Sequence, residues 1–311
     1  MTAIVVEGLV KDYGTFRAVD GISFSVAEGE IFALLGPNGA GKTTTVEILE
    51  GHRPRTSGNV AVLGDDPGTA GRGLRERIGI VLQEAGFDED FSPLELVTLY
   101  GRMFPRHLDP GDALDLVGLS DKRDARVKTL SGGQRRRLDL ALGLVGDPEL
   151  LFLDEPTTGF DPEARRKAWE LVENLRALEK TVLLTTHYMD EAEHLADRVA
   201  VVVHGRLVAL GTPEELAAAS KVSSILSFRL PSGLEAGDLP TLDGALVHEG
   251  LEWQLSTENP TRSLNTLTSW AVERGVEVPS LAVNRPSLED TYLALVAQFE
   301  PAEPGSGVAR R

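Results

Sequence analysis

The sequence contains no cysteine, and this absence removes several kinds of chemistry at once. Disulfides, thiolate metal sites and a cysteine nucleophile are excluded, and the composition is compatible with a reducing cytoplasm. The sequence also lacks any run approaching the ~18 consecutive apolar residues that a membrane-spanning helix needs. Its first residues, 1–7, show no positively charged leader with an apolar core, so we expect a protein that is neither exported nor embedded in a membrane.

Positive charge is scarce. The 311 residues include 31 lysines and arginines against 48 aspartates and glutamates, which gives a formal net charge of -17. A nucleic-acid binder needs clustered basic side chains to displace counterions from phosphates, so this balance argues against one. What the chain does have is 41% hydrophobic residues, enough for a sizeable core, and a length that suits two domains.

Short apolar segments alternate with amphipathic helical patterns, which predicts an α/β fold. Residues 4–10 and 22–26 are rich in β-forming residues, and a short strand at 30–35 ends at a glycine-rich loop. Continuous apolar runs at 150–153 and 199–203 are typical of strands buried in a parallel sheet. We therefore expect a largely parallel sheet covered by helices.

Two changes of pattern indicate the domain organisation. Ser92, Pro93 and Glu95 form a helix-start signal, and helical patterns continue from there, which predicts a helical insert at about residues 90–145. Near residue 220 the periodic core elements give way to shorter strands. We place the domain boundary there, which gives a large domain 1–220 and a small α+β C-terminal domain 221–299. The tail 300–311, rich in Pro, Gly and Ser, is expected to be disordered.

A glycine-rich loop lies between the strand at 30–35 and a helical segment at 43–49. Its glycines allow backbone N–H groups to point inward around phosphates. Lys42 adds charge for the β and γ phosphate oxygens, Thr43 offers a hydroxyl to magnesium, and Thr44 is a weaker phosphate donor. A turn that merely starts a helix is the alternative. The phosphate loop consists of Gly36, Pro37, Asn38, Gly39, Ala40, Gly41, Lys42, Thr43 and Thr44.

Two adjacent acids follow the apolar run at 150–153. A carboxylate at the end of a buried strand, here Asp154, is costly unless a cation or hydrogen bonds compensate it, so magnesium is the expected partner. The side chain of Glu155 points away from that of Asp154 and can reach a water aligned on the γ-phosphorus. We predict Glu155 as the catalytic base, with a capping or salt-bridge role as the alternative.

A second glycine motif, Leu-Ser-Gly-Gly-Gln at residues 130–134, precedes that strand. Ser131 and Gln134 satisfy the capping-box rule, so a well-capped helix is one interpretation. That interpretation leaves Gly132 and Gly133 unexplained, because each glycine costs about 1 kcal/mol relative to alanine inside a helix. Bare backbone at a helix N-terminus is favourable where it must approach an anion.

In this order the motifs resemble those of ABC-type ATPases, over about residues 1–220. The resemblance implies a P-loop NTPase core with a mixed β-sheet, an antiparallel β subdomain and the helical insert, and it implies ATP and Mg2+ as cofactors. In that family two subunits form a head-to-tail dimer, here a homodimer or a closely related heterodimer. The signature of one subunit contacts the γ-phosphate held by the other. Ser131, Gly132, Gly133 and Gln134 would act across that interface.

The resemblance assigns roles to four further residues. Tyr13 would stack on adenine, although packing near a turn is the alternative, and Gln83 would touch magnesium and link the core to the helical insert, with an exposed amide as the alternative. His187, expected at the carboxyl end of a strand, resembles the family's switch histidine on the γ-phosphate and so joins Lys42 and Glu155 as a catalytic candidate. Asp161 matches the acidic interface loop and is also an ordinary helix cap.

Residues 286–290, Pro-Ser-Leu-Glu-Asp, resemble the ending of ATPases paired with two-component exporters of drugs, antibiotics, lipids or polysaccharides. A capped amphipathic helix, Ser287 with Asp290, is the alternative. We expect an ATPase, peripheral on the cytoplasmic face of the cell membrane, that powers a separate integral-membrane permease for export. A non-transport ABC-type ATPase acting as a nucleotide-dependent regulator is the other interpretation. The cargo depends on the permease and is not encoded in this chain.

Overall fold

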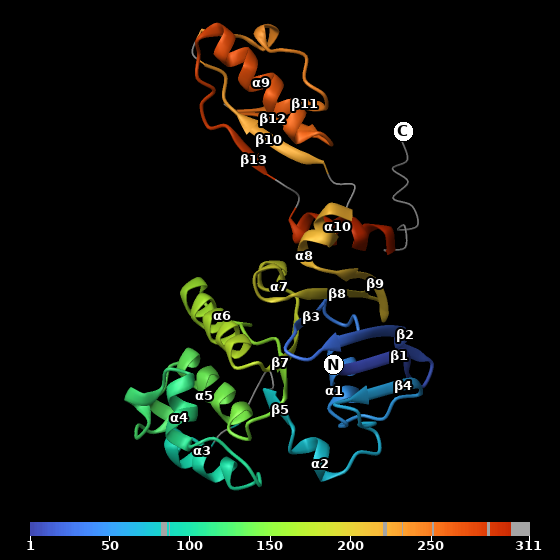
Figure 1. Cartoon of the computed structure of the whole chain (residues 1–311), viewed down its shortest axis with the longest axis vertical. Helices are drawn as coiled ribbons and strands as arrows, with labels where there is room; N and C mark the ends of the chain where they lie inside the picture. The colour runs from blue at the N-terminus through green and yellow to red at the C-terminus, as the bar shows by residue number, and fades with distance from the viewer. Residues whose placement is uncertain are drawn as a thin grey trace, which may run out of the picture. The chain divides into compact units, whose positions relative to one another are not determined.

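The computed structural model describes residues 1–81, 86, 88–219, 223–231, 233–250, 252–284 and 287–299. The chain forms two compact units, Met1–Pro213 and Glu214–Arg311 (Figure 1). The predicted boundary near residue 220 and the predicted tail 300–311 lie outside the described residues, so their structure is not considered. Gln83 and Pro286 lie outside them as well.

The first unit is built around a central sheet with the strand order β5-β6-β7-β3-β8-β9. Strands β8 and β9 pair antiparallel, and the other neighbours pair parallel. Residues of β3 and β7 are buried throughout, as the continuous apolar runs predict for strands covered on both faces. The strands are β3 (Ile31–Leu35), β5 (Ile78–Val81), β6 (Leu150–Asp154), β7 (Thr181–Thr186), β8 (Arg198–Val203) and β9 (Arg206–Gly211).

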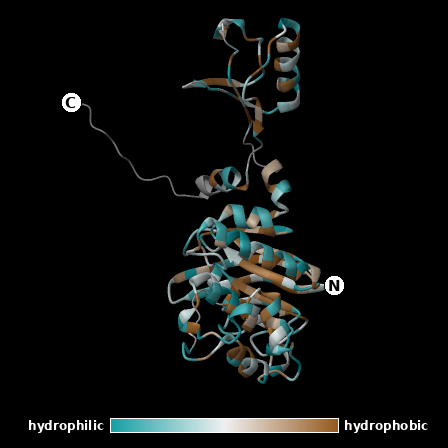
Figure 2. Ribbon diagram, turned by 90° about the vertical axis from the view of Figure 1, so that its left-hand side faces the viewer, coloured by the Kyte–Doolittle hydropathy of each residue, from teal (hydrophilic) through white to brown (hydrophobic). Residues whose placement is uncertain are grey.

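An antiparallel sheet packs beside this central sheet. It consists of β1 (Thr2–Tyr13), β2 (Phe16–Ala27) and β4 (Ser57–Val62), in the order β2-β1-β4. Its buried side chains join one hydrophobic core with residues of the central sheet, and the rings of Phe24 and Phe32 stack with centroids 5.2 Å apart. Figure 2 shows that hydrophobic residues concentrate along these strands. This shared core fixes the two sheets relative to each other.

Helices cover the central sheet and connect its strands. Between β5 and β6 the described residues form helices and short 3-10 turns and no strand. Helix α5 packs closely on β5: a Cβ at Gly79 would lie 2.2 Å from the carbonyl oxygen of Gly143. The helix start predicted at Ser92 is a complete capping box with Glu95. The helices of this unit are α1 (Lys42–Leu49), α2 (Arg72–Arg75), α3 (Pro93–Gly101), α4 (Pro110–Leu116), α5 (Gly132–Leu144), α6 (Pro162–Ala177) and α7 (Met189–Leu195).

The second unit is a small antiparallel sheet with helices. The sheet has the order β11-β12-β10-β13, and Phe228 packs against Leu267 and Trp270 of α9 in its own core. The predicted fold class, a mixed-sheet α/β core with an antiparallel subdomain and a small α+β domain, is confirmed. The elements are α8 (Pro213–Ala219), β10 (Ser224–Phe228), β11 (Ala245–Glu249), β12 (Glu252–Thr257), α9 (Pro260–Arg274), β13 (Ala282–Asn284) and α10 (Leu288–Phe299).

One acid is buried at the C-terminal end of α1, the helix that follows the phosphate loop. Glu50 follows α1, and its side chain is only 3% exposed. Burial, together with the nearby carboxylates of Asp154 and Glu47, raises the pKa of Glu50 to about 8. The Nδ1 atom of His52 lies 3.3 Å from Oε2 of Glu50. Ionising this carboxyl in the folded protein therefore costs free energy.

Replacing this acid by its neutral isostere should change the pH dependence of folding. A raised folded-state pKa contributes stability below the unfolded-state value, which is lost as pH rises through about 8. The Glu50→Gln variant should therefore lose less free energy of unfolding than the wild type between about pH 5 and about pH 8, by on the order of 1–3 kcal/mol. Urea denaturation at several pH values measures this. Parallel curves of the free energy of unfolding against pH for the two proteins would contradict the raised pKa of Glu50.

Candidate functional site

The phosphate loop connects the buried strand β3 to helix α1, as the sequence predicts. Gly41 stands directly before the helix with a φ of 100°, a conformation that favours glycine. A Cβ at this position would lie 2.5 Å from the carbonyl oxygen of Ala18. Both the backbone angle and the close approach of β2 therefore require glycine here.

Lys42 is the first residue of α1 and is buried, with 5% of its surface exposed. Its Nζ donates to the carbonyl oxygens of Gly36 at 2.7 Å and Pro37 at 3.2 Å. Burial lowers the pKa of the Lys42 ammonium, an effect that the carboxylates of Glu155 and Asp154 oppose. The loop thus curls around its own lysine, and the ammonium lies close to both acids.

A pocket of about 620 Å³ opens above this loop. The aromatic rings of Tyr13 and Phe16 form one wall, and Tyr13 is 39% exposed with Lys11 Nζ 5.0 Å from its ring centroid. An exposed aromatic ring with cations over it offers a stacking surface for a planar base. The remaining lining residues are Ala18, Asn38, Gly39, Gly41, Lys42, Thr43, Thr44, Arg53 and Glu155.

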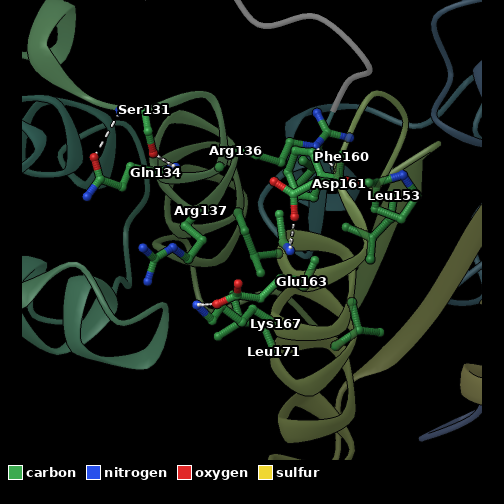
Figure 3. Close-up of a pocket in the computed structure, with 17 residues that line it drawn as sticks. Ser131, Gln134, Arg136, Arg137, Leu153, Phe160, Asp161, Glu163, Lys167 and Leu171 are labelled. Atoms are coloured by element: carbon green, nitrogen blue, oxygen red, sulfur yellow. Dashed lines mark hydrogen bonds and ion pairs between the residues drawn. The ribbon is translucent and has the colours of Figure 1, made fainter.

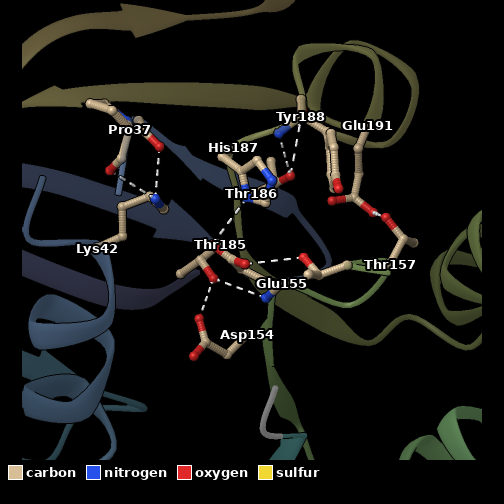
Figure 4. A network of polar contacts seen from close by, with 12 residues as sticks. Pro37, Lys42, Asp154, Glu155, Thr157, Thr185, Thr186, His187, Tyr188 and Glu191 are labelled. Carbon is tan, nitrogen blue, oxygen red and sulfur yellow. Dashed lines mark hydrogen bonds and ion pairs between the residues drawn. The ribbon is translucent and has the colours of Figure 1, made fainter. Parts of the chain in front are cut away.

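Asp154 and the residues around it lie where three parallel strands end. The register pairs Asp154 with Thr185 and Leu35 with Thr186, so the carboxyl ends of β6, β7 and β3 share one edge of the sheet. The Thr185 hydroxyl donates a hydrogen bond to Oδ1 of Asp154. The same hydroxyl accepts from the backbone N–H of Glu155 at 3.1 Å (Figure 4). Thr185 therefore bridges the two acids.

Glu155 has a left-handed backbone, with a φ of 45°. The sequence predicts only that its side chain points away from that of Asp154; the structure achieves this with a turn rather than with continued strand alternation. A non-glycine residue in this region is strained, and such strain persists where neighbouring contacts over-determine it. Oε2 of Glu155 accepts from the Thr158 hydroxyl at 3.0 Å, and the side chain is 13% exposed.

His187 stands directly after β7, at the carboxyl end of the strand where the sequence predicts it, and it faces Glu155. Its Nδ1 atom lies 3.2 Å from Oε1 of Glu155 (Figure 4). That distance suits an ion pair when the imidazole is protonated, but Nδ1 makes no hydrogen bond in the present geometry. The imidazole also packs on the Tyr188 ring with centroids 4.1 Å apart, which restricts its orientation.

Ser131 caps helix α5 in both directions of the capping box. Its hydroxyl accepts from the N–H of Gln134 at 3.3 Å, and its own N–H donates to Oε1 of Gln134 at 2.9 Å. A Cβ built on Gly132 or Gly133 would meet no heavy atom within 4 Å. The fold of this subunit therefore gives no steric reason for these glycines.

The signature faces an open hollow of about 770 Å³ that it shares with the loop ahead of α6. Asp161 lies in that loop, and its carboxylate accepts from the N–H of Ala164 at 2.8 Å as the N-cap of α6. Asp161 therefore has the capping role that the sequence offers as one interpretation. It also lines the same hollow as Ser131 and Gly132, which is compatible with a role at an interface.

A smaller pocket of about 290 Å³ lies between α5 and α6 (Figure 3). Leu140 of α5 and Leu171 of α6 belong to its apolar lining. At its rim the Nζ of Lys167 lies 2.6 Å from Oε1 of Glu163. The pocket shows that the two helices leave a gap between them close to the signature.

Sequence reasoning missed several residues that hold this site together. Glu191 of α7 is fully buried, and its Oε1 accepts from the Thr157 hydroxyl at 2.7 Å and from Nε1 of Trp169 at 3.2 Å. Burial raises the pKa of Glu191, and hydrogen bonds from threonine and tryptophan oppose that rise. No sequence motif signals Thr185, Glu191 or Arg136, because their partners are distant in sequence.

The fold and the arrangement at the strand ends define a class, the ATP-binding cassettes, and the chain belongs to the ATP-binding proteins of ABC transporters. Residues 19–158 match the ABC transporter family, and residues 224–287 match the C-terminal domain of the ABC transporter domain-containing protein-like family. Membership confirms the predicted ABC-type ATPase, which binds ATP and hydrolyses it to drive transport. Such subunits dimerise and pair with permeases.

Particular relatives make the likeness specific. The chain is 39% identical over 305 residues to the daunorubicin/doxorubicin resistance ATP-binding protein DrrA of Streptomyces peucetius, covering 94% of this chain and 92% of that protein. It is 48% identical over 218 residues to the Nod factor export ATP-binding protein I of Ralstonia nicotianae, covering 68% of this chain and 67% of that protein. The predicted resemblance to the exporter branch with a C-terminal extension is confirmed.

Solved structures agree with this membership. Among them is cbiO1 from Clostridium perfringens, part of the ABC transporter complex cbiONQ, with a TM-score of 0.64 and 31% identity over 70% of this chain and 91% of that one. The ADP conformation of another ATP-binding cassette of an ABC transporter gives a TM-score of 0.63 and 26% identity over 69% and 92%. In the described part of the chain, no helix combines the length and the apolar character needed to cross a membrane.

The bridging hydroxyl of Thr185 can be tested with an isosteric variant. Thr185→Val removes the contacts to Asp154 and Glu155 without changing the shape of the side chain, so kcat for ATP hydrolysis should fall by about tenfold or more. Loss of buried hydrogen bonds should also lower the free energy of unfolding by roughly 1–3 kcal/mol.

The matched control is Thr181→Val at the opposite end of β7, where the hydroxyl accepts from the N–H of Gly29 at 3.0 Å. It should lower stability in the same way and leave kcat unchanged. Steady-state hydrolysis and urea denaturation are measured on both variants. Equal kcat values for the two would show that Thr185 contributes to folding alone.

Proposed function

We propose that this chain is the ATP-hydrolysing subunit of an exporter for a drug, an antibiotic, a lipid or a polysaccharide. The observation that carries the proposal is the likeness, over 94% of this chain, to a daunorubicin/doxorubicin resistance ATP-binding protein. A relative named for Nod factor export supports the same direction of transport. The partner would be a separate integral-membrane permease, which would hold this subunit at the cytoplasmic face of the membrane.

We assign ATP to the pocket above the phosphate loop. The backbone around Lys42 would hold the phosphates, with Thr44 as a further donor, while Tyr13 stacks on adenine. The size of the pocket, its exposed ring and its buried ammonium support this assignment. The glycine-rich backbone and the helix N-terminus favour an anion at the same place.

Magnesium is proposed to be held by Thr43 and Asp154, with Gln83 as a further ligand. Among the described residues no cluster of three or more His, Cys, Asp or Glu side chains can hold a metal ion. This fits Mg2+, which usually takes one or two carboxylates together with substrate phosphates and water. When bound, the ion would neutralise charge on the phosphate oxygens.

Hydrolysis would begin when Glu155 accepts a proton from a water aligned on the γ-phosphorus. The water oxygen then bonds to phosphorus as the bond to the β-phosphate oxygen breaks, which leaves ADP and phosphate. Lys42 would offset the negative charge on the phosphate oxygens. His187, facing Glu155 from β7, would contact the γ-phosphate and sense its presence.

Two subunits would close head to tail around two nucleotides. Ser131, Gly132, Gly133 and Gln134 of one subunit would meet the γ-phosphate held by the other, with Asp161 at the same interface. The open space around both glycines supports this, since among the described residues no heavy atom lies within 4 Å of a Cβ built on either one. A homodimer or a closely related heterodimer satisfies the geometry equally.

The base is tested by Glu155→Gln. The amide preserves shape but accepts no proton, so kcat should fall on the order of 10² or more while ATP affinity is retained. Hydrolysis by the wild type should also rise more than linearly with protein concentration, because the dimer is the active form. Undiminished hydrolysis by the variant would remove Glu155 from its role.

The wild type and the Glu155→Gln variant also test the association with a permease. When purified from native membranes, both proteins should co-purify with one integral-membrane permease. Hydrolysis that is linear in protein concentration, without any membrane partner, would favour a nucleotide-dependent regulator instead.

The interface is tested by adding one methyl group. Gly133→Ala places a Cβ in open space inside a helix, so stability should stay equal or rise by up to about 1 kcal/mol. In a closed dimer the same methyl would face the other subunit's nucleotide, so kcat should fall by about tenfold or more.

Gly73→Ala in α2 is the control, because its Cβ also meets nothing within 4 Å. It should gain helix stability without loss of kcat. Thermal denaturation and hydrolysis assays of both variants decide between a free surface and an interface. Full activity of Gly133→Ala would contradict the proposed contact.

A further inference from the structure

Three consecutive arginines follow the signature, and they have different partners. Arg135 pairs with Glu89 at 2.7 Å, and Arg137 donates to the carbonyl oxygen of Gly118 at 2.7 Å, both within the helical segment between β5 and β6. Arg136 instead reaches across to the loop after β6. Figure 3 shows it extending from α5 toward the segment that carries Phe160 and Asp161.

The guanidinium of Arg136 binds the backbone around the proposed base. Its Nη2 donates to the carbonyl oxygens of Asp154 at 3.0 Å and Glu155 at 3.4 Å. Its Nε donates to the carbonyl oxygen of Pro156 at 3.1 Å. The side chain is only 12% exposed. One buried side chain therefore serves three successive carbonyl groups.

The backbone conformation explains why these carbonyl groups converge. Glu155 has a φ of 45°, so the chain turns here, and the N–H of Thr158 also donates to the carbonyl oxygen of Glu155 at 3.3 Å. Buried carbonyl groups need donors, and the planar guanidinium supplies several in a fixed geometry, which a lysine ammonium does not. Asp139 has a side chain 10% exposed and lies 3.9 Å from Nη1. Burial raises the pKa of the Asp139 carboxyl to about 7, an effect that Arg136 opposes.

We propose that Arg136 is a positioning residue that fixes the turn at Glu155 and links it to the signature at the start of the same helix. This inference rests on the proposed function. Ser131, Gly132 and Gly133 begin α5, and Arg136 follows in its next turn. A shift of α5 on contact with the other subunit's nucleotide would move the carbonyl groups that orient Glu155. Each signature would thus act on the other subunit's nucleotide and on its own base.

The alternative is a purely structural tie between a helix and a strand, and Arg77 provides the matched control. Arg77 stands directly before β5, and its Nε lies 2.7 Å from Oε1 of Glu149, which stands directly before the neighbouring strand β6. Its Nη1 donates to the carbonyl oxygen of Leu63 at 3.1 Å. Arg77 therefore also joins a carboxylate and a backbone carbonyl, but at the opposite end of the strand from the site.

The test uses the full-length variants Arg136→Lys, Arg136→Met and Arg77→Lys. Lysine keeps a positive charge beside Asp139 but lacks the planar set of donors of the guanidinium. The Arg136→Lys protein should therefore fold even if the methionine variant does not. Its kcat at saturating ATP should fall by about tenfold or more, because small misplacements of a reacting group have effects of this size. Its KM and its affinity for trinitrophenyl-ATP should stay within about threefold of wild type.

The control should separate positioning from folding. Arg77→Lys should lower the melting temperature while its kcat stays within about twofold of wild type. A double variant, Arg136→Lys with Gly133→Ala, should lose less activity than the product of the two single losses, since both act through α5.

Several outcomes would overturn the proposal. An unchanged kcat for Arg136→Lys, or equal losses of kcat for Arg136→Lys and Arg77→Lys, would leave Arg136 with only a structural role. If the activity loss of the double variant equals the product of the two single losses, Arg136 and the signature act independently. In each case the proposed function stands as long as wild-type hydrolysis depends on Glu155, and it fails separately if wild-type hydrolysis does not.

Discussion

The left-handed turn at Glu155 is the constraint around which the rest of the site is arranged. Strand β6 delivers Asp154 in an extended conformation, and the next residue turns the chain so that its carboxylate reaches the pocket above the phosphate loop. Such a turn costs roughly 1–2 kcal/mol for a residue with a Cβ. Thr185 holds the N–H of the turn and Arg136 holds its carbonyl groups, so a strand and a helix stabilise it together.

The electrostatics of the site follow from the shared edge of the sheet. Because β3, β6 and β7 end in register, the loop carrying Lys42 comes close to the acids at 154 and 155. The buried ammonium is stabilised by both carboxylates and by carbonyl groups of its own loop. Opposite charges are thus gathered at the place where a phosphate chain and a metal ion are proposed to bind, before either arrives.

The signature is proposed to serve two purposes with one set of atoms. Within the subunit, Ser131 and Gln134 cap α5 completely, so the helix needs no partner in order to begin there. Gly132 and Gly133 add nothing to that cap and leave open space beside the loop that holds Asp161. A site that is complete in folding terms and open toward solvent is what a head-to-tail pair of subunits requires.

Local periodicity and neighbours a few residues apart predicted several strands, among them those at 30–35 and 150–153, together with the capped helices and the motifs. The sequence by itself determined the phosphate loop, Asp154 and Glu155 as candidates, and Ser92 and Ser131 as caps. It predicted the opposite directions of the two acids, but from strand alternation, whereas the structure uses a left-handed turn.

Only the tertiary structure revealed Thr185, Glu191 and Arg136 as the residues that hold those candidates in place. Their hydrogen bonds join positions far apart in the chain, and no local pattern records such pairings. The chemistry was therefore readable from the sequence because it needs particular residue types at fixed spacing. The geometry was not, because it depends on which strand ends and helices the fold places side by side.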